Sequence, residues 1–339
     1  MSRPPRRSAQ LLGHLLVPAI AALIGAVPGC ASTLYTVTQI AGFNPAADDS
    51  ALNDSGQIAG TTWAGTAGIW SNGVITSAGT LGGISSLAEA INNSGELAGE
   101  SFVAGNTAAP AFLYRDGSVE NLGTLGGAYA VAEGINESGQ AVGYSYTTSG
   151  PPHAFLYDGG SMIDLGTLGG SSSIAYGINS SGEVTGTSAV ASEDGHAFLY
   201  SDGVMTDLGT LGGSSSYGFA INNSGQVAGM AYLPDNSAFH AFFYGSGTMM
   251  DLGTLGGAVS EAHGINDSGH VVGFAYTPAG VAHAFLYSEG AMIDLNSVID
   301  PSLNISLQEA YAINNAGQIL ANGNHGWELL TPETATPEP

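Results

Sequence analysis

Short apolar runs alternate with glycine-rich polar turns along almost the whole chain, and the alternation repeats with a nearly constant period. The most regular element reads small residue, Ile or Leu, Asn, any residue, Ser or Ala, Gly. It occurs seven times, with successive copies 39 to 48 residues apart. A period of about 43 residues is the length of one four-stranded propeller blade, a unit that must stack on neighbours to bury its apolar faces. The seven asparagines are Asn53, Asn92, Asn136, Asn179, Asn222, Asn266 and Asn314.

Each repeat contains four short apolar segments. In the fifth repeat they cover residues 217–221, 226–232, 240–244 and 249–255. The first two flank the turn 222–225, where Asn and Ser can bond local backbone groups and Gly tolerates positive φ. The third is too short for a helix and is nearly continuously apolar, as expected of a strand covered on both faces. The pattern predicts four antiparallel strands, a to d, with d–a and b–c connections at one end and a–b and c–d turns at the other.

The two ends of the repeat array are complementary. After Asn314 the last repeat has strands b and c but no strand d, whereas residues 36–42 near the N-terminus match strand d of the middle repeats. Pairing of this segment with the last repeat would close the ring and remove exposed sheet edges. The sequence therefore predicts an all-β fold, a seven-bladed β-propeller closed by the N-terminal strand. An open β-solenoid is the alternative, and it leaves the N-terminal strand unexplained.

The first 31 residues have the pattern of a secretory signal. Three arginines precede an apolar run from about residue 11 to 27, which is short for a membrane span and ends in small residues. We expect a propeller over residues 33–332 and a Pro/Thr-rich tail over 333–339. Residues 27–30 resemble a bacterial lipobox apart from Pro28, so Cys30 is either a lipidated N-terminus or part of an ordinary cleavage region. The expected location is secreted, periplasmic or on the bacterial cell surface, with no transmembrane span in the mature chain.

Charge narrows the choice of partner. The chain has 28 acidic residues against four arginines and no lysine, and Arg115 is the only arginine outside the signal segment. Nucleic acid is excluded as a partner because phosphate binding requires cationic side chains. Cys30 is the only cysteine, so the folded domain contains no internal disulfide.

Two phrases carry a family resemblance. His-Ala-Phe-Leu-Tyr followed by Asp-Leu-Gly-Thr-Leu-Gly-Gly resembles the bacterial extracellular HAF repeat family, most strongly over residues 112–295. The resemblance implies export and repetition, and it supplies no catalytic residues. The final Pro-Glu-Pro (337–339) is similar to the start of the PEP-CTERM sorting signal. Because the apolar helix and basic cluster of that signal do not follow, the likeness is either a truncated signal or chance.

Histidines at the start of strand c form one predicted column, which a ring would spread around its circumference. They therefore cannot converge on one metal ion. Four of them are followed eleven residues later by an aspartate, which predicts a structural hydrogen bond across the c–d hairpin, provided that its turn has two residues. The Asn-turns offer at most one acid each, too few for calcium, and no cofactor is predicted. The column is His153, His196, His240, His283 and His325, and the aspartates are Asp164, Asp207, Asp251 and Asp294.

One position varies strongly between otherwise uniform repeats: the residue three before each repeat asparagine. We expect this column at the start of strand a, lining the central channel, with the irregular b–c and d–a connections opening at the same end. Its members are Ser50, Glu89, Glu133, Tyr176, Phe219, His263 and Tyr311.

Carboxylates, aromatic rings and a histidine around one opening suit a glycan or an extended peptide. The sequence thus favours a non-enzymatic exported repeat protein of the cell envelope or extracellular matrix that binds a glycan or a protein on one propeller face. The alternative is a propeller carbohydrate-active enzyme of lyase or glycosidase type that uses Glu89, Glu133 and His263. A third interpretation is that the column merely fills the channel. No catalytic triad context, phosphate-binding loop or zinc spacing occurs in the chain.

Overall fold

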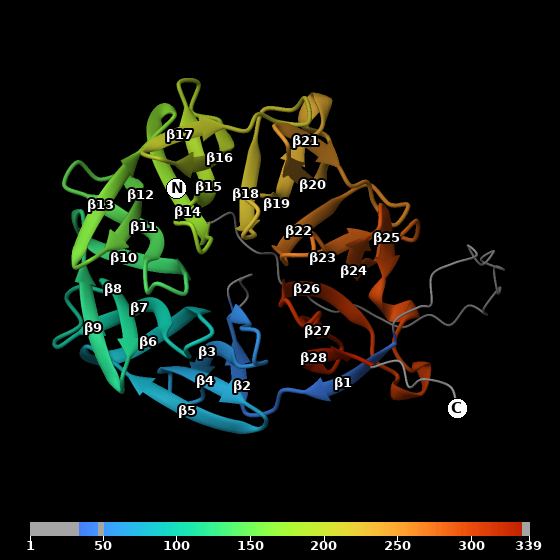
Figure 1. Cartoon of the computed structure of the whole chain (residues 1–339), viewed down its shortest axis with the longest axis horizontal. Helices are drawn as coiled ribbons and strands as arrows, with labels where there is room; N and C mark the ends of the chain where they lie inside the picture. Colours follow the sequence, from blue (N-terminus) through green and yellow to red (C-terminus); the bar gives the residue numbers. More distant parts are fainter. Residues whose placement is uncertain (1–33, 47–50, 334–339) are drawn as a thin grey trace.

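The computed structural model describes residues 34–46 and 51–333, and it contains seven four-stranded antiparallel sheets arranged in a ring (Figure 1). The chain is therefore a seven-bladed β-propeller, as the repeat predicts. The predicted signal segment with Cys30, the C-terminal Pro-Glu-Pro and Ser50 lie outside the described residues.

The first three blades follow one another along the chain. Blade 1 contains β2 (Phe43–Pro45), β3 (Ile58–Thr62), β4 (Ala67–Ser71) and β5 (Val74–Gly79). Blade 2 contains β6 (Gly82–Ile91), β7 (Leu97–Val103), β8 (Ala111–Arg115) and β9 (Ser118–Gly123). Blade 3 contains β10 (Gly126–Ile135), β11 (Ala141–Thr147), β12 (Pro152–Asp158) and β13 (Ser161–Gly166).

The next three blades continue the same order. Blade 4 contains β14 (Gly169–Ile178), β15 (Val184–Val190), β16 (Gly195–Ser201) and β17 (Val204–Asp207). Blade 5 contains β18 (Ser216–Ile221), β19 (Val227–Tyr232), β20 (Phe239–Gly245) and β21 (Thr248–Asp251). Blade 6 contains β22 (Ser260–Ile265), β23 (Val271–Tyr276), β24 (Ala282–Ser288) and β25 (Ala291–Asp294). The 3-10 turn η2 (Pro234–Asn236) lies between β19 and β20, and η3 (Leu295–Ser297) and η4 (Pro301–Leu303) precede blade 7.

Blade 7 joins the two ends of the chain. Its strands are β26 (Leu307–Ile313), β27 (Ile319–Gly323), β28 (Gly326–Pro332) and, from the N-terminus, β1 (Tyr35–Gln39). β1 pairs antiparallel with β28, with Val37 opposite Leu330. The predicted closure by the N-terminal strand is confirmed, and β1 covers what would otherwise be the outer edge of β28.

The core consists of apolar layers between neighbouring blades. The Phe of the His-Ala-Phe motif, which reads Pro-Ala-Phe in blade 2, is fully buried in five successive blades. Phe155 of blade 3, for example, packs in one cluster with Ala90, Ala98 and Leu113 of blade 2. This explains why strand c is apolar on both faces, since each blade is covered on either side. The five phenylalanines are Phe112, Phe155, Phe198, Phe242 and Phe285.

The histidine column needs one correction in blade 7. Strand pairing places Gly323 opposite Gly326, which gives Gly326 the place that His283 holds in blade 6. His325 therefore lies one residue before the column, not in it. The same register puts Glu328 where the other blades carry their buried phenylalanine. Blade 7 has Glu328 in place of the phenylalanine, so the sequence offered only His325 for aligning this blade with the others, and that alignment was wrong by one residue.

The predicted His–Asp hydrogen bonds are confirmed in blades 3 to 6. Each His Nδ1 lies 2.6 to 3.0 Å from a carboxylate oxygen of its aspartate across the c–d hairpin. The hairpins close with two-residue turns, as in the pairing of Gly245 with Thr248. Blade 1 keeps the contact with hydroxyls instead, because Thr66 Oγ1 lies 2.8 Å from Ser77 Oγ. Each pair thus links strands c and d of its own hairpin.

No helix within residues 34–46 and 51–333 is long and apolar enough to cross a membrane.

Candidate ligand-binding site

The repeat asparagines form a closed ring of hydrogen bonds at the a–b turn end of the channel. Each Nδ2 donates to the backbone carbonyl oxygen of the corresponding asparagine in the next blade, at 2.9 to 3.1 Å. Within its own turn, Asn222 Oδ1 accepts hydrogen bonds from the backbone N–H groups of Ser224 and Gln226. The asparagines are only 2–4% exposed. Asparagine is required here because one side chain must donate to a neighbour and accept from its own turn.

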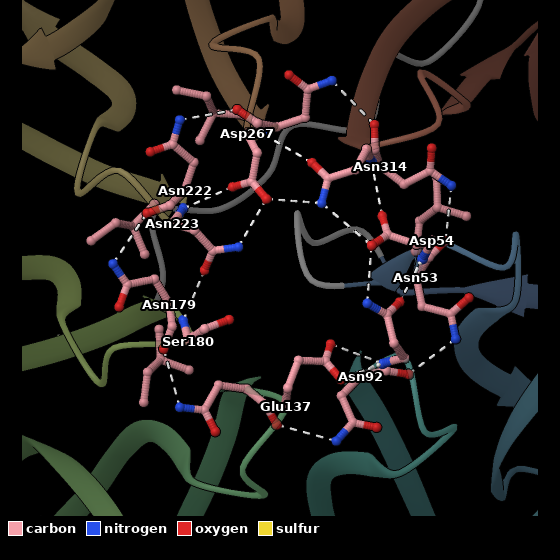
Figure 2. Close-up of a pocket in the computed structure, with 18 of the residues that line it drawn as sticks. Asn53, Asp54, Asn92, Glu137, Asn179, Ser180, Asn222, Asn223, Asp267 and Asn314 are labelled. Carbon is pink, nitrogen blue, oxygen red and sulfur yellow. Dashed lines mark hydrogen bonds between the residues drawn. The ribbon is translucent and has the colours of Figure 1, made fainter.

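A cavity of about 200 Å³ lies at this end of the axis, lined by turn residues of all seven blades. Figure 2 shows the side chains arranged around a central opening. The residues after the asparagines also link blades: Asp54 accepts from the backbone N–H of Asn315, and Asp267 accepts from that of Asn223. Most polar groups of these turns are therefore bonded to one another, which supports a structural role for this end of the ring.

The variable column is a column of β-bulges. In blades 2 to 7 the register of strands a and b shifts at the column residue: in blade 2, Ala88 lies opposite Gly99 and Ala90 opposite Ala98, so the register passes over Glu89. Each bulged residue lies two positions before the end of strand a, and not at its start as the sequence suggested. A bulge inserts one extra residue and redirects its side chain. The described members of this bulge column are Glu89, Glu133, Tyr176, Phe219, His263 and Tyr311.

A glycine in strand b accompanies the bulge in blades 2 to 6. A Cβ on Gly229 would lie 1.9 Å from the carbonyl oxygen of Tyr217, far inside contact distance. Gly99, Gly143, Gly186 and Gly273 face the same approach. The bulge brings the two backbones too close for any side chain, so the glycine and the bulge occur together.

Four bulge-column residues form a continuous chain of ring contacts across blades 4 to 7. The ring centroids of Tyr176 and Phe219 are 5.3 Å apart, those of Phe219 and His263 are 6.0 Å apart, and those of His263 and Tyr311 are 5.4 Å apart. Strand a is the innermost strand of each blade in Figure 1. The bulges thus bring side chains from separate repeats together around the axis, and such aromatic pairs contribute beyond their buried area.

A polar cluster lies beside this aromatic chain. His263 Nε2 is 2.8 Å from Glu309 Oε1, and the Tyr311 hydroxyl donates to Glu309 Oε2 at 2.5 Å. Glu261 Oε1 lies 3.9 Å from His263 Nδ1. His263 therefore sits between two carboxylates, with Phe274 also in ring contact with it.

Exposure rises toward the d–a end of the channel. The side chain of His263 is 9% exposed, whereas that of Glu261, two residues earlier on β22, is 18% exposed. In blade 7, Tyr311 is buried and the Glu309 side chain is 30% exposed. We call the positions two residues before the bulge column the rim. In blades 2 to 7 the rim residues are Leu87, Val131, Ile174, Tyr217, Glu261 and Glu309.

The structure thus brings part of the predicted site together. Tyr176, Phe219, His263 and Tyr311 are in contact, as the column predicts. Glu133 is 2% exposed and Glu89 is half-buried, so Glu133 presents almost no surface to solvent. The rim residues Tyr217, Glu261 and Glu309 were missed. Their position, five residues before each asparagine, is as variable as the bulge column, and that variability was the available signal.

Metal binding finds no support in the described part of the chain. No group of three or more His, Cys, Asp or Glu side chains is placed to hold a metal ion within residues 34–46 and 51–333.

Comparison with known proteins places the fold. The chain is similar to the β-propeller domain of the Trilobed protease from Pyrococcus furiosus, at 10% identity and a TM-score of 0.56, over 90% of this chain and 100% of that one. It is similar to virginiamycin B lyase from Staphylococcus aureus, at 12% identity and a TM-score of 0.53, over 88% and 100%. A puromycin-hydrolyzing peptidase from Mycobacterium tuberculosis matches at 11% identity and a TM-score of 0.50, over 90% of this chain but 52% of that one.

No protein-family model and no curated protein sequence matches the chain. At these identities the structural likeness shows the β-propeller class alone, because one fold hosts many unrelated functions.

Proposed function

We propose that the protein is an exported, non-enzymatic propeller of the HAF repeat type, which binds a glycan or a protein at the d–a end of its channel. One observation carries the proposal. The most variable positions of an otherwise uniform repeat contact one another at the axis, from Tyr176 through Phe219 and His263 to Tyr311. Diversity concentrated at one end of a repeated scaffold is typical of a binding face.

The rim supports binding over simple filling of the channel. The bulge column is mostly buried and serves as a floor, whereas the side chains of Glu261 and Glu309 are partly exposed above it. Tyr217 stacks on Phe219 with centroids 6.1 Å apart and an interplanar angle of 11°. Side chains that only filled space would not need to combine partly exposed acids with aromatic rings.

The enzymatic alternative uses Glu89, Glu133 and His263 as its acid–base groups. A catalytic carboxyl must contact the substrate, and Glu133 is 2% exposed. This burial favours the non-enzymatic interpretation.

Export is proposed from the sequence. The arginines before the apolar run, the acidic composition and the lone Cys30 suit a processed protein of the cell envelope or the extracellular matrix. Mass determination of the N-terminus of the protein from its native host would test this. A chain that keeps Met1 and remains in the cytoplasm would contradict export, and a diacylglyceryl group on Cys30 would show the lipid anchor.

Binding is tested with residues 33–333 on glycan and protein arrays. We expect retention of at least one ligand that Phe219→Ala weakens, because the floor under the rim is lost. Asp202→Asn is the matched control, since Asp202 is exposed in a c–d turn at φ 52°, a conformation that asparagine tolerates. If no ligand is retained, or if both variants weaken retention equally, the proposed site is wrong. Bond cleavage that is lost in the double variant Glu89→Gln, Glu133→Gln would establish the enzyme instead.

A further inference from the structure

The rim is chemically divided across the ring. In blades 2 to 4 it consists of the aliphatic residues Leu87, Val131 and Ile174, of which Leu87 is 38% exposed, Ile174 is half-buried and Val131 is buried. In blades 5 to 7 it consists of a tyrosine and two carboxylates. A ligand that covers the rim therefore meets an apolar arc on one side and an acidic, aromatic arc on the other.

No cationic side chain other than histidine balances the acidic arc. Arg115 is the only arginine in the described residues, and its guanidinium pairs with Glu120 on the c–d hairpin of blade 2. The Glu309 carboxylate accepts one hydrogen bond from Tyr311 and contacts His263 Nε2. The Glu309 side chain is 30% exposed, so a bound donor can reach it. An anionic ligand would lose its hydration here without gaining a cationic partner, whereas an ammonium group would gain charge-assisted hydrogen bonds.

Aromatic rings contact the same histidine that contacts these carboxylates. Phe274 and Phe219 both contact the ring of His263, and Tyr217 stacks on Phe219. Aromatic faces attract cations and pack against the C–H face of a flat ring. Carboxylates and aromatic rings grouped around one histidine suit a ligand that carries an amine next to a ring.

We infer that the ligand of this site is a saccharide with free amino groups, such as a de-N-acetylated hexosamine polymer. The inference rests on the proposed function and specifies its ligand class. The amine binds at Glu309 and Glu261, the sugar ring stacks on Tyr217 and Phe219, and the next sugar covers the aliphatic arc of the rim. The amine selects this class over neutral glycans, and the absence of rim arginine and lysine selects it over acidic ones.

The test measures the affinity of residues 33–333 for two hexosamine oligomers that differ only in N-acetylation. Calorimetry is carried out at pH 6 and low salt. We expect the free amine form to bind about tenfold tighter or better, since a hydrogen bond to a charged group contributes about a factor of ten. We expect Glu309→Gln to remove about that factor for the free amine form and to leave the acetylated form almost unchanged.

The controls separate a specific site from general attraction to an acidic protein. Asp202→Asn removes one carboxylate from the opposite end of the ring and should change the affinity less than twofold at moderate salt. Because Glu309 also holds His263 and Tyr311, thermal melting must show that Glu309→Gln is folded. Glu261→Gln, whose carboxylate is 3.9 Å from His263, provides a second variant for the same contact.

The outcomes distinguish the two proposals. Equal binding of both oligomers, or exclusive binding of an acidic glycan or a protein that Phe219→Ala weakens, overturns the amino-sugar inference and leaves the proposed function intact. An equal effect of Asp202→Asn and Glu309→Gln also overturns the inference, because the attraction is then unspecific. If no glycan or protein binds in any arm, both proposals fail.

Discussion

The side-chain amide of Asn314 donates a hydrogen bond to the backbone carbonyl oxygen of Asn53, 261 residues earlier in the chain, at 2.9 Å. This bond completes a cycle in which each repeat asparagine holds the next, through all seven blades. The ring is thus closed twice: at its inner edge by Asn314 and Asn53, and at its outer edge by β1 on β28. Both closures join residues from opposite ends of the sequence: the first links blade 7 to blade 1, and the second completes blade 7 itself.

Replacement of a repeat asparagine should strongly destabilise the domain. Asn314→Ala leaves the backbone N–H of Gln318 without its acceptor, and it removes the inter-blade hydrogen bond to the carbonyl of Asn53, which keeps only the bond from the N–H of Gly56. We expect the free energy of unfolding to fall by about 2–4 kcal/mol, because unsatisfied buried groups keep their desolvation cost. Denaturant unfolding measures this. Asn72→Gly, at an exposed turn residue with φ 49°, should change the stability by less than about 0.5 kcal/mol, and an equal loss in both variants would contradict a special role for the asparagine ring.

Deletion of residues 33–42 should destabilise the whole propeller and not the last blade alone. Without β1, strand β28 exposes an edge, and Tyr35 leaves the apolar cluster that it shares with Leu295, Leu307 and Leu330. We expect a single unfolding transition at a clearly lower temperature in calorimetry. An unchanged melting temperature would show that the asparagine ring alone closes the structure.

Glu328 should make stability depend on pH. Its carboxyl is 1% exposed, and neither of its oxygens has a hydrogen-bond partner among the described residues. Burial raises its pKa above the ordinary value of 4.5, against a smaller opposing effect of His325. Because the folded-state pKa is the higher one, the contribution to stability is fully present below about pH 4.5 and is lost as pH rises through the folded pKa. The stability of the wild type relative to Glu328→Gln should therefore decrease from about pH 4.5 upward.

Glu328→Phe restores the side chain that five other blades carry at this position. At pH 7 we expect it to raise the free energy of unfolding by about 1–3 kcal/mol, since a buried unpaired carboxylate is replaced by an apolar ring. The pH dependence should disappear with it. A wild type and a Glu328→Phe variant of equal stability at all pH values would show that the carboxyl is solvated or paired in solution.

The His–Asp pairs should contribute little individually, and Asp should matter more than His. Asp251 bonds both His240 and the backbone N–H of Gly253, so Asp251→Ala removes two contacts and His240→Ala removes one. Both side chains are partly exposed, so we expect losses of about 0.5–1 kcal/mol and less for His240. The double variant His240→Thr, Asp251→Ser copies the hydroxyl pair of Thr66 and Ser77 and should recover part of the loss. If the double variant loses more stability than His240→Ala and Asp251→Ala lose together, the hydroxyl pair does not replace the His–Asp pair.

The local chemistry of the repeat was readable from the sequence. A period near 43 residues, two-residue turns rich in Gly and Asn, and the orphan strand at residues 36–42 determined the number of blades and their closure. The turns depend on backbone preferences that act over a few residues. The closure follows because residues 36–42 match strand d, which recurs in every middle repeat. The eleven-residue spacing of His and Asp likewise predicted a contact within one hairpin.

The position of the candidate site depended on pairing between strands. Seven similar turns carry no sign that each Asn bonds the next blade, because the acceptor is a backbone carbonyl 39 to 48 residues away or, for Asn314, 261 residues away. The bulge moved the variable column from the expected start of strand a to a point near its end. The rim side chains Glu261 and Glu309 are therefore more exposed than the bulge-column residue His263.

Blade 7 shows the same division between local and tertiary information. The sequence placed His325 in the histidine column, since residue identity is all that an alignment of single repeats can use. The register of β27 and β28 put Gly326 there and moved Glu328 into the phenylalanine layer. The sequence by itself determined a ring of seven blades, because repetition and turn chemistry are local. Tertiary structure alone decided which side chains meet at the axis, because a one-residue shift in strand pairing turns a side chain to another face.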